Sequence, residues 1–210
     1  MTRILLASHN PGKLQEMLAL LASLPIELCT PADLALDLQV DEAGQDYAAN
    51  AQLKAAAFAR AAGCWVLADD TGLEVDALGG APGLHSHRLL EDHPTHPLQA
   101  APSDAERRRV LLAILRPFPR PWTARFRCAV ALCGPQGTLD LADGTCPGQV
   151  IPEERGQAGF GYDRIFLVEG TDRTLAELGL EEKNRLSHRG RAVAALMPRL
   201  HSRLGLDPAP

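Results

Sequence analysis

The chain has 210 residues, 46% of them hydrophobic, and carries a formal net charge of −5. This length favours a single domain, or two closely joined lobes that share one core. The negative charge argues against nonspecific binding to nucleic acid polymers, whose affinity comes mainly from lysine and arginine. The first apolar run, RILLAS, is far too short for a signal peptide or a membrane span.

The five cysteines are scattered, odd in number and without a C-x-x-C pair. This pattern is typical of reduced thiols rather than of a disulfide framework or a zinc site. We therefore expect a cytoplasmic protein that does not engage a membrane.

Strand and helix patterns alternate from the start of the chain. A short strand is predicted at 4–8, followed by a helix with Asn10 as its N-cap and Pro11 in its first position. An alanine-rich helix is predicted at about 47–62, opened by Asp46. The apolar stretch CWVLA then predicts a strand that ends at two adjacent acids. The apolar stripe of the first helix is expected to consist of Leu14, Met17, Leu18 and Leu21.

The same alternation continues in the second half of the chain. Ser103 and Thr174 each begin a capping box ahead of a helix, and a last helix starts after Ser187. The runs ARFRCAVALC and IFLV predict further strands, whereas residues 91–103, rich in proline and histidine, predict a mobile, solvated loop. Strands that alternate with helices predict an α/β fold.

Two lysines stand where a negatively charged ligand could bind. The segment SHNPGK places Gly12 and Lys13 at a helix N-terminus, where outward-facing N–H groups and the helix dipole favour an anion. A well-capped helix with a solvated lysine is the alternative, because the Walker motif is incomplete. Lys54 lies with Asn50 on a mostly apolar helix face, an unusual place for a lysine that a bound anion would explain. The alternative is that the lysine stem packs on this face while its ammonium group reaches water.

Adjacent acids at the end of a buried strand need a partner. Side chains alternate along a strand, so Asp69 and Asp70 face opposite ways. Burying either carboxylate is costly unless cations or hydrogen bonds compensate. Ligands of open α/β sheets collect at such strand ends, and upstream Asp41 and Glu42 offer further oxygen ligands. The alternatives are acids that cap the following turns and loop acids that are simply solvated.

Two later motifs combine aromatic, acidic and basic residues. In GQAGFGYD, glycines allow Phe160 to lie close to a flat ligand while Asp163 accepts a hydrogen bond from its edge. A plain turn with a core phenylalanine explains this motif equally well. In EEKNRLSHRGRA, basic residues stand near a helix start, where the dipole normally favours acids, which indicates an anionic or carbonyl-bearing ligand.

Taken in order, SHNPGK, LADDTGLEVDALGGAPGLHSHR, FGYDRIF and AELGLEEKNRLSHRGRA resemble the Ham1/inosine triphosphatase family of non-canonical purine nucleoside triphosphate pyrophosphatases. The resemblance implies a long mixed sheet with flanking helices, and two lobes around a central cleft within one domain, 1–205, followed by a tail, 206–210. It also implies a homodimer and Mg²⁺-dependent hydrolysis of ITP, dITP and XTP to the monophosphate and pyrophosphate. The sequence departs from the family pattern at Ala49, at Arg164 and in the run HSHR.

Carried over by position, the resemblance makes Asp70 the catalytic base and a metal ligand, and Glu42 a second metal ligand. The substrate-binding positions that it implies are Ser8, His9, Asn10, Pro11, Gly12, Lys13, Lys54, Thr71, Phe160, Gly161, Tyr162, Asp163, Lys183, His188 and Arg189.

The chemistry that these assignments imply is attack of water on the α-phosphorus. Mg²⁺ would hold the triphosphate, and either Asp70 or a metal-bound hydroxide would deliver the nucleophile. Lys13 and Lys54 would neutralise the departing pyrophosphate. Donors from Arg189 or His188 would bind the 6-keto oxygen of hypoxanthine or xanthine. Adenine, which presents a donor at this position, would be excluded. A Maf-like pyrophosphatase acting on other nucleotides, and a sensor that binds ITP without cleaving it, are the competing interpretations.

Overall fold

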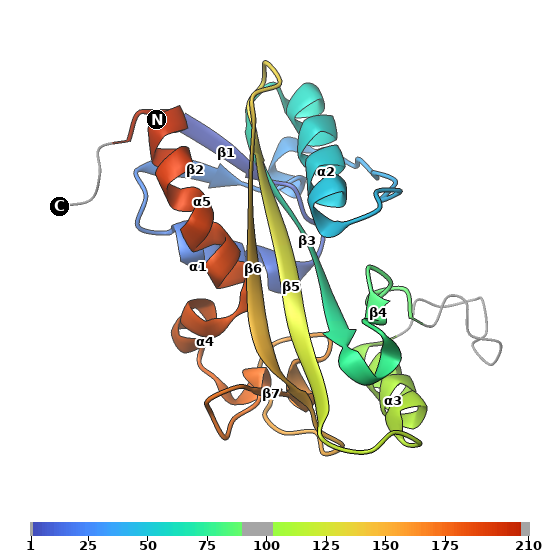
Figure 1. Ribbon diagram of the computed structural model, residues 1–210. Coiled ribbons are helices and arrows are strands. Elements are labelled where there is room, and N and C mark those ends of the chain that lie inside the picture. Colours follow the sequence, from blue (N-terminus) through green and yellow to red (C-terminus); the bar gives the residue numbers. More distant parts are fainter. Residues whose placement is uncertain (1, 90–102, 207–210) are drawn as a thin grey trace. The chain divides into compact units, whose positions relative to one another are not determined.

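A computed structural model describes residues 2–89 and 103–206 of the chain (Figure 1). It contains one mixed sheet of seven strands in the order β2-β1-β3-β5-β6-β7, with β4 paired to β3. Strand β1 runs parallel to both β2 and β3, whereas β3–β4 and β6–β7 are antiparallel. The strands are β1 (Thr2–Leu6), β2 (Ile26–Cys29), β3 (Trp65–Val75), β4 (Pro82–Gly83), β5 (Trp122–Cys133), β6 (Leu139–Val150) and β7 (Phe166–Val168).

The helices confirm most of the local signals in the sequence. Asn10 caps the first helix and Pro11 occupies its first position, Asp46 caps the second, and Ser103 closes a capping box with Glu106. The α-helices are α1 (Pro11–Leu21), α2 (Tyr47–Ala62), α3 (Asp104–Leu115), α4 (Leu180–Leu186) and α5 (His188–Leu204). Short 3₁₀ turns cover Ala32–Leu34, Asp76–Leu78, Asp163–Ile165 and Leu175–Glu177. The α/β class and the mixed sheet are thus confirmed.

The chain divides into two compact units that interleave along the sequence. Unit 1 comprises Met1–Asp70, Cys128–Gly144 and Asn184–Pro210. Unit 2 comprises Thr71–Arg127 and Thr145–Lys183. The boundaries fall inside β3, β5, β6 and α4, so each unit contains one part of each of these elements.

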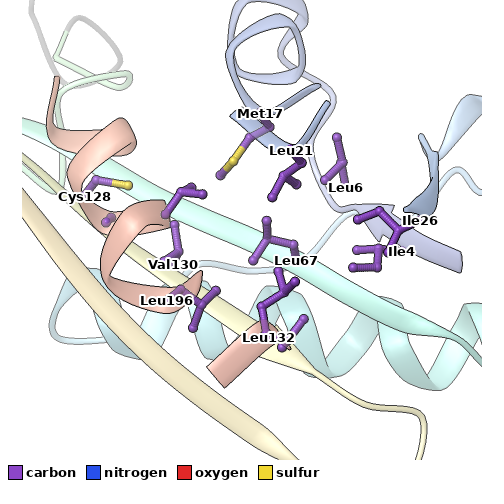
Figure 2. Packing of buried hydrophobic residues seen from close by; sticks show 13 residues of the cluster. Ile4, Leu6, Met17, Leu21, Ile26, Leu67, Cys128, Val130, Leu132 and Leu196 are labelled. Atoms are coloured by element: carbon purple, nitrogen blue, oxygen red, sulfur yellow. The ribbon is translucent and has the colours of Figure 1, made fainter. Parts of the chain in front are cut away.

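Unit 1 has helices on both faces of its part of the sheet (Figure 1). On one face, α1 and α5 pack on alternate residues of the strands, including Ile4 and Leu67 (Figure 2). On the other face, α2 packs on the intervening residues, including Leu5 and Ala68. Because successive strand residues point to opposite faces, the two hydrophobic layers fix the direction of every side chain in this part of β3.

Unit 2 includes α3, β4, β7, the loop between β6 and β7, and the first part of α4, up to Lys183. The Phe126 and Phe166 rings lie 4.7 Å apart between centroids, at a tilted angle of 59°. Tyr162 is buried and its hydroxyl donates to the carbonyl oxygen of Ser86 at 2.8 Å. These contacts fix the segment that carries the FGYD motif.

Several elements differ from the sequence prediction. Strand β3 does not end at the acid pair but continues to Val75, because Thr71–Val75 keeps an extended, mostly buried backbone. Strands β2, β4 and β6 are absent from the sequence prediction, and the short helix predicted after Thr174 is a 3₁₀ turn at Leu175–Glu177 that α4 follows. Leu18, expected in the buried stripe of α1, is 38% exposed, whereas the acidic Glu16 is buried there.

Two further predictions concern compartment and mobility. The described part of the chain contains all five cysteines, and each of them is a free thiol. None of the helices that the structure describes is long and apolar enough to cross a membrane. Most of the predicted loop at 91–103 and most of the tail at 206–210 lie outside the described residues.

Candidate active site

The two adjacent acids of β3 face opposite layers of unit 1, as strand alternation predicts. Asp69 points to the layer of α1 and α5, where its partners are Lys13 and Arg189. Asp70 lies on the same side of β3 as Val66 and points to the layer of α2. Both side chains are buried, with 2% and 7% of their residue surfaces exposed. The two carboxylates therefore have separate partners and separate roles.

Asp69 is the centre of a buried cluster of charges. Arg189 donates to its carboxylate through Nε at 3.1 Å and Nη2 at 3.0 Å, and Lys13 Nζ lies 3.2 Å from the same oxygen. Burial alone would raise the pKa of Asp69, but Lys13 and Arg189 outweigh it and hold this pKa well below its usual range. Arg189 also pairs with Glu16, so its guanidinium is shared between two buried acids.

Asp70 is held by the side-chain amide of Asn50. The Asn50 amide nitrogen donates to Asp70 at 3.0 Å, and the Asn50 carbonyl oxygen accepts from the Gly44 N–H at 2.8 Å. Desolvation by burial raises the pKa of Asp70, although Lys13, Asn50 and Lys54 oppose it. A carboxylate with a raised pKa is a stronger base than an exposed aspartate.

Lys54 connects the loop that carries Glu42 to strand β3. Its ammonium lies 2.5 Å from the Glu42 carboxylate and donates to the backbone carbonyl of Asp69 at 2.9 Å. Burial would lower the pKa of Lys54, but Asp69, Glu42 and Asp70 outweigh it and raise this pKa. Lys54 is therefore a largely buried ammonium group that is held by two partners.

The SHNPGK segment forms a capped helix start next to this cluster in unit 1. The Gly12 and Lys13 N–H groups both donate to the Asn10 side chain, at 2.9 and 3.1 Å. Because the N-cap satisfies these two N–H groups, they have a partner within the protein. The charge of Lys13 and the helix dipole remain as features that favour an anion. Ser8 accepts from the Asn10 N–H, and His9 contacts the Leu38 carbonyl oxygen at 3.2 Å.

The FGYD motif of unit 2 forms a tight loop around Asp163. The Asp163 carboxylate accepts from the Phe160 N–H at 2.8 Å and lies 2.6 Å from Lys183 Nζ. Lys183 also sits over the Phe160 ring, 5.1 Å from its centroid. Gly159 is required here, because a Cβ at that position would lie 2.1 Å from Asp163 Oδ2. The loop presents a half-buried aromatic ring beside a buried ammonium group.

The structure divides the EEKNRLSHRGRA motif between the two units. Lys183 belongs to unit 2 and pairs with Asp163, whereas His188 and Arg189 open α5 in unit 1 and are buried. The ion pairs of Arg189 with Asp69 and Glu16 account for an arginine at a helix start, without an external anion. Thr71 follows Asp70 in β3 and is half-buried.

Sequence reasoning missed several residues that shape the two clusters. Glu16 gave a readable signal, since it stands between Leu14 and Met17 on a helix that needs an apolar inner face. Asp104, Arg107 and Arg108 gave none, because basic and acidic residues are normal on a helix surface. In the structure both arginines are buried, and Asp104 and Arg108 bind the Gly161 backbone.

Carboxylates suited to magnesium lie in unit 1. Within residues 2–89 and 103–206, no group of three or more histidine, cysteine or acidic side chains is arranged to hold a metal. Mg²⁺ does not require such a cage, since it commonly binds one or two carboxylates together with water and substrate phosphates. Glu42 and Asp70 supply two hard oxygen donors, and both lie next to the Lys54 ammonium or the Asn50 amide. This donor set fits Mg²⁺ and fits neither zinc nor a soft metal.

Comparison with known proteins identifies the family of this chain. A family model described as Ham1 family matches residues 4–199. A dITP/XTP pyrophosphatase from Anaeromyxobacter dehalogenans is 42% identical over an alignment of 226 positions, which covers 94% of this chain and 96% of the relative.

Two solved structures are also similar to this chain. A HAM1 protein from Coxiella burnetii has a TM-score of 0.82 and 36% identity, covering 96% of this chain and 100% of that structure. A nucleoside-triphosphatase, described as a dITP/XTP pyrophosphatase, from Mycobacterium abscessus has a TM-score of 0.69 and 40% identity, covering 94% and 100%. The chain therefore belongs to the Ham1 family.

Proposed function

We propose that this chain is a nucleoside triphosphate pyrophosphatase that hydrolyses ITP, dITP and XTP to the monophosphate and pyrophosphate. The family membership and the names of the relatives support this function. The observation that carries it is the cluster in unit 1, where the buried carboxylate of Asp70 lies near Lys13 and Lys54, two ammonium groups suited to phosphate. A protein that only binds nucleotide needs no such base.

Asp70 is the group that accepts a proton from the attacking water. The Asn50 hydrogen bond fixes the orientation of this carboxylate, so that it can receive the proton. Lys13 and Lys54 bind triphosphate oxygens and stabilise the negative charge of the departing pyrophosphate. Ser8, His9 and Asn10 shape the turn that presents Lys13.

Glu42 and Asp70 are the residues that hold Mg²⁺ in this proposal. The ion, when bound, neutralises phosphate charge and polarises the reacting phosphorus. Glu42 is paired with Lys54 in the structure. On binding of substrate and metal, this ion pair would be replaced by two others, Glu42 with Mg²⁺ and Lys54 with the triphosphate.

The FGYD loop of unit 2 is assigned to the nucleobase. The half-buried ring of Phe160 offers a face on which a purine stacks, and Lys183 offers a donor for a 6-keto oxygen. Adenine presents an amino group at that position, which meets the Lys183 ammonium donor to donor and costs binding. His188 stays a second candidate donor, whereas Arg189 has Asp69 and Glu16 as its partners.

Pyrophosphate release across a nucleotide panel tests the function. We expect rapid release from XTP, dITP and ITP in the presence of Mg²⁺, and turnover of ATP, GTP and UTP that is slower by orders of magnitude. Equal efficiency with ATP would contradict the hydrogen-bond argument. A preference for UTP would favour the Maf-like alternative, and tight binding of ITP without pyrophosphate release would favour a sensor.

Two further features belong to the same proposal. The free cysteines support a reducing compartment, and we place the enzyme in the cytoplasm, where nucleotide pools are used. The family resemblance supports a homodimer. Fluorescence microscopy of a tagged chain and light scattering of the purified protein test these two points.

A further inference from the structure

The loop assigned to the nucleobase is held from outside by helix α3. Phe160 and Asp163 are linked within the loop, but Gly161 between them has no side chain and a positive φ of 60°. Glycine in this conformation carries a high entropic cost of ordering. Its peptide groups therefore depend on partners elsewhere in unit 2.

Asp104 and Arg108 supply these partners from the two sides of Gly161. The Gly161 N–H donates to Asp104 Oδ2 at 2.6 Å, and Arg108 Nη1 donates to the Gly161 carbonyl oxygen at 2.7 Å. The two side chains are four residues apart on α3 and so lie on the same face of the helix. Together they hold both hydrogen-bonding groups of one loop residue.

The Arg108 side chain is also held by a second partner, Glu154. Its guanidinium binds Glu154 through Nε at 2.8 Å and Nη2 at 3.0 Å, while the third nitrogen binds Gly161. Arg108 is 5% exposed, so its position is set by packing as well as by charge. A bidentate pair of this kind gives a geometry that a lysine cannot reproduce.

Asp104 is fixed in a similar way. Burial would raise its pKa, but the Gly161 N–H and Arg107 outweigh it, so the pKa of Asp104 is lowered and the carboxylate stays ionised. Asp104 occupies the first position of α3, where the capping box of Ser103 defines the helix start. The end of a well-defined helix thus sets the position of the loop backbone.

We propose that Asp104 and Arg108 are positioning residues for nucleobase selection, acting through Gly161 on the orientation of Phe160. This inference rests on the proposed function, in which Phe160 and Lys183 receive the base. Neither residue needs to touch the nucleotide. Loss of either contact leaves the triphosphate cluster of unit 1 unchanged but lets the ring and Lys183 sample other positions.

The test compares kcat/KM for XTP and ATP, measured by pyrophosphate release with Mg²⁺. For Arg108→Met we expect the XTP-to-ATP ratio to fall by about tenfold, with most of the loss in the KM for XTP. Asp104→Ala, which changes a more exposed side chain, should shift the ratio in the same direction. Arg109→Met is the matched control, because Arg109 is the next residue of α3 and is exposed; its ratio should equal that of the wild type.

The outcomes separate this inference from a general loss of stability and from the proposed function. A merely destabilised enzyme loses activity with both nucleotides and keeps its ratio, so an unchanged ratio in the folded variants overturns the inference. If Arg108→Met does not fold, as judged by its thermal transition, the ratio of Asp104→Ala alone decides. A wild-type protein that releases no pyrophosphate from XTP, dITP or ITP refutes the proposed function instead.

Discussion

Asn50 binds two segments of unit 1 at the same time: its amide nitrogen donates to Asp70 at 3.0 Å and its carbonyl oxygen accepts from Gly44 at 2.8 Å. Gly44 lies two residues from Glu42, so one buried amide connects the loop of one proposed metal ligand to the side chain of the other. The fit is close, since a Cβ at Gly44 would lie 2.6 Å from Asn50 Oδ1.

This relationship predicts that Asn50→Asp reduces activity although the side chain keeps its size. The new carboxylate cannot donate to Asp70 and repels it, so Asp70 loses its orientation. We expect kcat to fall by about 10- to 100-fold, a loss typical of outer-sphere partners of metal ligands. Steady-state kinetics with XTP measure it. Gln52→Glu is the control, because it adds the same charge on the exposed side of α2; an equal loss there would contradict the prediction.

Replacing the proposed base gives a sharper prediction. Asp70→Asn removes the proton acceptor with little change in volume, and kcat/KM for XTP should fall by about 10³-fold or more. Thermal unfolding should show that the fold is retained. The exposed Asp37 provides the control Asp37→Asn, which should keep wild-type kinetics. Substantial activity in Asp70→Asn would mean that another group activates the water.

Metal removal should stop the reaction in a reversible way. We expect EDTA to abolish pyrophosphate release from XTP and excess Mg²⁺ to restore it. Glu42→Gln should raise the Mg²⁺ concentration needed for half-maximal activity, because a neutral amide is a weaker ligand than a carboxylate. Glu27→Gln breaks an exposed pair with Arg3 and serves as the control. Full activity in EDTA would rule out the assigned metal role.

The buried pair of Asp69 and Arg189 predicts a stability effect. Asp69→Asn leaves a buried guanidinium and Lys13 with less compensating charge, and we expect a loss of about 3 kcal/mol in the free energy of unfolding. Urea unfolding at neutral pH measures this loss. Glu27→Gln is the control, since Glu27 and its partner Arg3 are both exposed and a pair of this kind contributes little to stability.

The same pair makes stability depend on pH in a defined direction. Because the pKa of Asp69 is lowered in the folded state, its contribution is fully present above the unfolded pKa of about 4 and is lost as the pH falls below it. Between about pH 5 and pH 2 the wild type should therefore lose more stability than Asp69→Asn does. Parallel curves for the two proteins would show that Asp69 is not the titrating group.

Much of the local structure could be predicted because it depends on neighbouring residues. The caps at Asn10, Asp46 and Ser103 involve bonds within three residues, and the sequence alone places the helix starts that they define. The opposite directions of Asp69 and Asp70 also follow from strand geometry alone. Strand β6 could not be predicted, because LDLADGTCPGQV contains residues that disfavour strands and is extended only through its neighbours in the sheet.

The sequence by itself determined the α/β class, the helix starts and the motifs that carry the family resemblance, because these depend on composition and on short-range spacing. Only the tertiary structure decided which charges meet. Arg189 reaches Glu16 across 173 positions of the chain, and Arg108 reaches Gly161 across 53. Such pairs form when packed layers bring distant segments together, and the cost of burying each charge then selects partners that no local pattern encodes.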